Sequence, residues 1–131
     1  MQMTRHLHKN ERGQTMVEFT MVLPILVIVL FGIIQFGLTF NNYVALTDAV
    51  RAGARTAAVS RFSATPLNDT VNRVKNASGD LDPSKVNVTV TTSWTQGGDV
   101  VVKATYPYSI SLLGVVVASG SLSSQTTERV E

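Results

Sequence analysis

Apolar residues are concentrated in one long run near the beginning of the chain. Between Glu18 and Asp48 there is no charged side chain, and the segment from Phe19 to Phe40 is almost entirely hydrophobic. As a helix this segment would be about 33 Å long, which is enough to cross a hydrocarbon layer of about 30 Å. A helix that is apolar on all sides could instead be buried in a soluble protein, but this chain is too short to surround it. The pattern therefore predicts a membrane span at residues 19–40.

The run is longer than the apolar region of a secretory signal peptide, which has about 7 to 15 residues. It is followed by Asn41, Asn42 and Tyr43 rather than by small residues suited to cleavage. We therefore expect the span to be retained. Basic residues are more numerous before the span than after it, which modestly favours a cytoplasmic N-terminus.

The helix is predicted to continue beyond the span, to about Ser60, because residues 43–59 are rich in Ala and Arg and contain no Pro. Pro24 removes one backbone donor near the beginning of the helix, and Gly32 and Gly37 loosen its middle, so a kink or local unwinding is expected within the span. The continuation carries small residues at a spacing of four, namely Ala45, Ala49, Gly53 and Ala57. Such a stripe permits close packing, either on the protein's own sheet or on neighbouring helices.

A short amphipathic helix is predicted after Thr65 and Pro66, which suit an N-cap and a first helical position, and before Gly79, a typical stop. Its apolar face is expected to consist of Leu67, Val71 and Val74.

Alternating polar and apolar residues then predict strands at 86–92 and 99–106, joined by a turn at 96–98. A second apolar run at 110–118 and a polar, strand-compatible segment at the end of the chain could add one or two strands. The expected fold class is α+β, with a three- or four-stranded antiparallel sheet. The residues predicted to face the long helix are Val86, Val88, Val90, Val100 and Val102.

Composition narrows the possible chemistry. Cysteine is absent, and both histidines, His6 and His8, lie in the basic leading segment. This disfavours thiolate, zinc and Ser-His chemistry. Without residues 1–13 the side chains comprise eight basic and eight acidic groups (11 − 3 and 9 − 1), so no basic patch suggests a nucleic acid partner. The sequence shows no catalytic constellation, and we expect no enzymatic activity, no cofactor and no metal.

The order of residues around Gly13 is the most informative feature of the chain. A short basic leader precedes Gly13, four uncharged residues follow it, and Glu18 then comes directly before the apolar run. One reading is that Glu18 is a favourable carboxylate in the first helical turn, near the positive end of the helix dipole. The other is that Glu18 is a charge at the membrane boundary that requires a cation from a partner.

The segment from Gly13 to Phe19, GQTMVEF, resembles a class III prepilin processing site. Together with the following apolar run and DAVRAGARTAAV, it is similar to TadE-like proteins, the pilin-like subunits of tight-adherence (Flp-type) pilus systems. The resemblance implies cleavage by a prepilin peptidase between Gly13 and Gln14, with Glu18 guiding assembly. Phe19 and Pro24 complete the segment expected to take part in assembly and recognition.

The resemblance implies a cytoplasmic leader at 1–13, a long N-terminal helix at 14–62 and an α+β head outside the cytoplasm at 63–131. The predicted function is that of a structural minor pilin or pseudopilin of a bacterial tight-adherence pilus, taking part in pilus assembly, adhesion or secretion. It would span the inner membrane once and could enter the extracellular pilus. Its expected partners are the prepilin peptidase, the lipid bilayer, and other pilin-like subunits and the assembly platform through the N-terminal helix. The alternatives are an unprocessed, membrane-anchored envelope binding protein and, with less support, a small tethered hydrolase.

Overall fold

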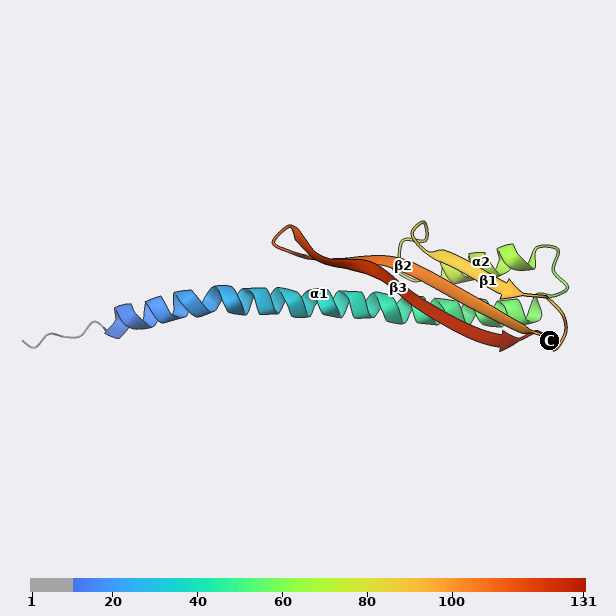
Figure 1. The fold of residues 1–131 in the computed structure, drawn as a ribbon, viewed down its shortest axis with the longest axis horizontal. Helices are drawn as coiled ribbons and strands as arrows, with labels where there is room; N and C mark the ends of the chain where they lie inside the picture. Colours follow the sequence, from blue (N-terminus) through green and yellow to red (C-terminus); the bar gives the residue numbers. More distant parts are fainter. Residues whose placement is uncertain (1–10) are drawn as a thin grey trace, which may run out of the picture.

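The computed structural model describes residues 11–131, which form two helices and one sheet. Helix α1 runs from Glu11 to Val59, and helix α2 from Pro66 to Ala77. The strands are β1 (Asn87–Thr92), β2 (Asp99–Leu112) and β3 (Val115–Arg129). In Figure 1 α2 and most of the sheet lie along the later half of α1. The closed end of the β2–β3 hairpin reaches beside the first half, and the beginning of α1 extends away from both. The predicted α+β, pilin-like fold is confirmed.

Helix α1 is continuous over 49 residues. It begins three residues earlier than Gln14, the predicted start, and ends close to the predicted end. The helix passes through Pro24, Gly32 and Gly37 without a break, so no local unwinding occurs within the span. Pro24 still has no N–H to offer the carbonyl of Thr20, and Figure 1 shows a gentle curve in this part of α1.

The sheet has three antiparallel strands in the order β1-β2-β3. Strands β2 and β3 are much longer than β1, so their distal parts form a two-stranded ribbon that β1 does not cover. The ribbon closes at Leu113 and Gly114, which have φ angles of +50° and +85°. The apolar run predicted at 110–118 thus forms the end of a hairpin, with an irregular register between Ile110 and Ser111.

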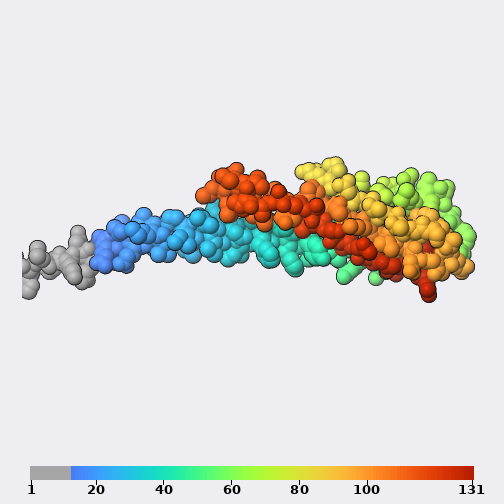
Figure 2. Space-filling model, viewed as in Figure 1, coloured from blue at the N-terminus to red at the C-terminus, as the bar shows by residue number. Residues whose placement is uncertain are grey.

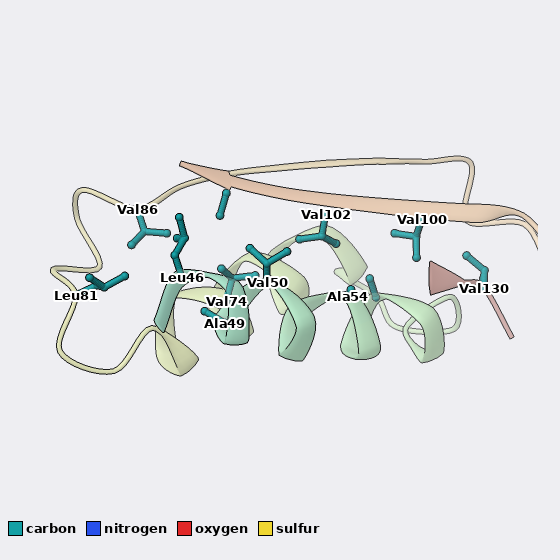
Figure 3. Close-up of a cluster of buried hydrophobic side chains, with 12 residues drawn as sticks. Leu46, Ala49, Val50, Ala54, Val74, Leu81, Val86, Val100, Val102 and Val130 are labelled. Carbon is teal, nitrogen blue, oxygen red and sulfur yellow. The ribbon is translucent and has the colours of Figure 1, made fainter. Parts of the chain in front are cut away.

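The hydrophobic core lies between the later half of α1, the sheet and α2. Leu46, Val50 and Ala54 on α1 point toward the sheet, where Val100 and Val102 are fully buried (Figure 3). The prediction that the strand valines face the long helix is confirmed for Val100 and Val102. Val86 is buried in the same core, but Val88 and Val90 are only partly buried and lie on β1, which packs near α2 and not against α1, so the prediction was wrong for these two. Alternation therefore correctly separated the two faces of the sheet.

Helix α2 begins at Pro66 and is followed by Gly79 with a φ of +61°, as its predicted boundaries require. Its buried residues are Thr70 and Val74, whereas Leu67 is half exposed. The predicted apolar face was thus wrong at Leu67. The hydroxyl of Thr70 donates to the carbonyl of Pro66 (2.8 Å), which satisfies its polar atom and permits its burial.

The last residues of the chain fasten the sheet to the end of α1. The N–H of Glu131 donates to the carbonyl of Ala58 (2.9 Å), and Val130 is buried in the core. Val130 also exchanges two backbone hydrogen bonds with Gly97 and Gly98 in the loop between β1 and β2 (both 2.8 Å). The hydrogen bond from Glu131 satisfies the carbonyl of Ala58, which α1 leaves free at its C-terminal end.

Candidate assembly site and membrane anchor

The first half of α1 presents apolar side chains in all directions. From Met16 to Phe40 its large hydrophobic residues are exposed or at best partly covered, and none of the most apolar part is buried within the chain. In the part of the chain that the structure describes, α1 is the one helix long and apolar enough to cross a membrane. In the space-filling view the beginning of α1 projects beyond the rest of the molecule without cover (Figure 2).

The few hydroxyl groups on this surface are satisfied within the helix. The hydroxyl of Thr20 donates to the carbonyl of Met16 (2.7 Å), and that of Thr39 donates to the carbonyl of Gln35 (3.0 Å). Hydrocarbon cannot supply hydrogen bonds, so polar groups in a membrane helix need partners of this kind. The hydroxyl bonds therefore fit a helix that lies in lipid.

Gly13, Gln14 and Glu18 lie together at the beginning of α1. The side-chain amide Nε2 of Gln14 donates to Oε1 of Glu18 over 3.2 Å, one helical turn away, and both side chains are exposed. The sequence motif had not suggested this bond, although a spacing of four residues puts the two side chains on one helix face. The part of the leader from residue 1 to residue 10 lies outside the described residues.

The position at which α1 begins argues against the first interpretation of Glu18, that of a carboxylate in the first helical turn. Because α1 begins at Glu11, Glu18 follows the helix start by seven residues (18 − 11) and lies beyond the first turn. The stabilising effect of the dipole falls off within that turn. In the uncleaved chain Glu18 is therefore not a first-turn carboxylate. A helix that started at Gln14 would bring it to the fifth position, directly after the first turn.

The neighbouring candidates, Phe19 and Pro24, are both exposed on the uncovered part of α1. They lie on the same surface as the apolar residues of the span and make no contact with the head. The described part of the head therefore supplies no partner for these two side chains.

The stripe of small residues lies mostly inside the head. Ala49, Gly53 and Ala57 are buried, and Ala45 is partly buried against the core. A Cβ atom added to Gly53 would collide with the side chain of Val74 on α2. The close approach that this stripe permits is thus used by the protein's own α2 and sheet, and three of its four members offer no surface to another helix.

A cleft that the sequence did not suggest lies where β2 separates from α1. It has a volume of about 430 Å³ and is lined on the helix by Gln35, Leu38, Thr39 and Asn42, and on the other side by Lys85 and residues 106–109 of β2. Tyr108 is one of the lining residues, and its ring packs so closely over Gly120 on β3 that a Cβ there would press against it. The absence of a side chain at Gly120 therefore positions Tyr108.

The described residues contain no group of three or more His, Cys, Asp or Glu side chains that could hold a metal ion. In the head, Asp82 has a pKa below its ordinary value, because the hydroxyl and the N–H of Ser84 donate to Oδ1 (2.6 and 3.0 Å). Lys85 adds a smaller attraction that lowers the pKa further. These contacts form a local turn between α2 and β1 and leave Asp82 exposed.

Together, the uncovered apolar helix and the small packed head define a class of protein: a pilin-like α+β protein with a single-pass membrane anchor. Residues 13–55 match the family model described as TadE-like protein, which confirms the TadE-like resemblance seen in the sequence. The match begins at Gly13 and covers the exposed half of α1 and much of its buried half. No curated protein and no solved structure matches the chain. TadE-like proteins are structural pilus components, which indicates a role associated with the tight-adherence pilus.

Proposed function

We propose that this protein is a non-enzymatic minor pilin or pseudopilin of a tight-adherence pilus, released from its leader by a prepilin peptidase that cuts between Gly13 and Gln14. The observation that carries the proposal is the position of Gly13 and Glu18 at the beginning of α1, directly before its uncovered apolar segment. A helix of this kind can lie in the bacterial inner membrane before assembly and pack against other apolar helices afterwards. The head would lie outside the cytoplasm.

Cleavage requires the peptidase to reach the bond between Gly13 and Gln14, which lies in the first turn of α1. Helix ends fray, and a Gly costs about 1 kcal/mol relative to Ala in a helix. Gly13 therefore makes this turn easier to open than the apolar helix behind it.

Cleavage would also change the electrostatic partners of Glu18. The new terminal amino group at Gln14 is a cation at the same end of the helix, and a neighbouring subunit's amino group could pair with Glu18. In the chain described, Glu18 has only the neutral amide of Gln14, which is a weaker partner than a cation. An ion pair between subunits would offset much of the cost of placing the carboxylate among apolar helices.

The test is to follow cleavage, membrane retention and co-purification with pilus components for Glu18→Gln. We expect cleavage and retention to continue and co-purification to fail, because removing one partner of a buried ion pair costs about 3 to 5 kcal/mol. Normal co-purification would contradict the assembly role. Loss of cleavage would instead assign Glu18 to recognition by the peptidase.

Gln14→Ala is the matched control. It removes the hydrogen bond to Glu18 within the chain but keeps the new terminal amino group. If Gln14→Ala assembles normally while Glu18→Gln does not, the amino group rather than the side-chain amide is the partner of Glu18. Mass spectrometry of the membrane-extracted protein tests the cleavage step, and Gly13→Leu should block it. An intact N-terminus in cells with an active peptidase would favour the unprocessed envelope binding protein.

A further inference from the structure

The end of the β2–β3 ribbon is an exposed apolar surface that the pilin role does not explain. We define the ribbon tip as residues 112–117, LLGVVV. Leu113 is 78% exposed, and Val115, Val116 and Val117 are also exposed. No charged side chain occurs between Lys103 and Glu128, so the parts of β2 and β3 that form the ribbon lack the charges that usually protect an exposed strand edge.

The turn at the end of the ribbon places a leucine in a backbone conformation that leucine rarely adopts. Leu113 has a φ of +50°, and the two turn residues with positive φ are most often Asn, Asp or Gly. A bulky apolar residue at such a position costs conformational energy and places a hydrophobic side chain in water. The turn geometry therefore does not explain why a leucine occupies position 113. A contact between its side chain and a partner outside the chain would explain it.

The position of the tip along α1 indicates what that contact is. Residues 106–109 of β2 share a cleft with Gln35, Thr39 and Asn42 of α1. From Ser109 to Leu113 the strand advances about 13 Å, which equals about nine residues of helix. In Figure 1 the tip lies beside the first half of α1, so it reaches the level of the apolar segment 19–40.

Tyrosines mark the level at which this apolar segment meets the head. Tyr106 and Tyr108 line the cleft, and Tyr43 is partly exposed on α1 close to it in sequence. Tyrosine is enriched where a membrane meets water. The ribbon tip lies beyond these residues, in the direction of the span.

We infer that the ribbon tip contacts the lipid bilayer that α1 spans, in the leaflet nearest the head. Beside an upright α1 the tip would be level with the middle of segment 19–40, where the backbone groups on the outer edges of a two-stranded ribbon find no partners in hydrocarbon. The inference therefore requires α1 to be tilted so that the tip lies at the boundary between headgroups and acyl chains. The protein thus has two membrane contacts, and the second fixes the tilt and rotation of the head on its anchor. This inference depends on the anchoring of α1 and not on cleavage or pilus assembly.

The chain has no cysteine, so single cysteines can report the environment of the tip. We would reconstitute the full chain, one copy per nanodisc of phosphatidylethanolamine and phosphatidylglycerol, with an environment-sensitive fluorophore on Leu113→Cys. A label on Val116→Cys, on the other strand of the tip, gives a second reading if the turn does not accept the first. Phe62→Cys is the matched control, because Phe62 is also apolar and 86% exposed but lies between α1 and α2, away from the tip.

We expect the tip labels to emit at shorter wavelength than the Phe62 label, to be quenched by nitroxides near the lipid headgroups, and to be protected from aqueous iodide. Tip labels that iodide quenches as strongly as the Phe62 label would overturn the inference. Protection that arises only in nanodiscs with two copies would also overturn it, since the occupant would then be a second copy of the chain. Neither result depends on the peptidase or on pilus partners, so failure here leaves the proposed function intact.

Discussion

The two halves of α1 belong to one unbroken helix but are adapted to different surroundings. The first half is apolar on all sides and uncovered, whereas the second half carries charged residues such as Asp48 and Arg51 on one face and buries small and aliphatic residues on the other. A uniform apolar surface suits a solvent that is the same in all directions, such as lipid. A two-faced surface suits a boundary between a core and water. The two halves have the same helical backbone, so the distribution of their side chains alone decides that the first suits a membrane and the second suits the core of the head.

The largest difference between the halves should arise on truncating a leucine. Leu46→Ala removes a fully buried side chain and should destabilise the head by about 2 to 5 kcal/mol. Leu30→Ala removes the same atoms from the exposed half and should leave unfolding of the head unchanged. The protein's one tryptophan, Trp94, packs against the core and reports unfolding by urea in detergent. Equal shifts for the two variants would mean that the halves are not distinct.

A smaller difference is expected from enlarging a glycine. Gly53→Leu forces a side chain into Val74 and should cost about 1 to 3 kcal/mol, because α2 must move away from α1. Gly37→Leu is the matched control, since nothing lies within 4 Å of a Cβ added there. Thermal unfolding of the two variants in the same detergent measures the difference. A stable Gly53→Leu protein would show that α2 is not held close to α1.

The smallest expected effect is on how the stability of the head depends on pH. The segment 19–40 of the first half contains no charged residue, so only the head can show such a dependence. The lowered pKa of Asp82 means that its ionised form is favoured in the folded head. This contribution is fully present above the ordinary carboxyl pKa and is lost as pH falls through the lowered pKa of the folded state. Asp82→Asn should therefore slightly reduce stability at neutral pH and remove this part of the acid dependence. Urea unfolding at neutral and acidic pH tests it, with Asp80→Asn in the same loop as the charge-matched control.

Much of the fold was predictable because it depends on local patterns. An apolar run without charge predicted the exposed helix, and strict alternation predicted the inward valines of β1 and β2. The candidate site was predictable only in part. Gly13 and Glu18 are neighbours in sequence, but the cleft between Gln35 and Tyr108 joins residues far apart in the chain, and no local pattern indicates such a pairing.

Where a sequence pattern permits more than one packing partner, only the tertiary structure shows which partner is used. The stripe from Ala45 to Ala57 could have packed on any close partner, and the position of α2 determined that Gly53 meets Val74. The same contact turned Thr70 inward and left Leu67 half exposed, because a helix buries the side facing its neighbour even where that side carries a hydroxyl. The apolar run at 110–118 indicated only that a strand could form there, and the length of β2 carries this run past the core to the level of the span. The sequence by itself determined which elements form, since periodicity and turn residues act over a few positions. Which surfaces meet, and which stay uncovered, depended on distances between elements that no local pattern encodes.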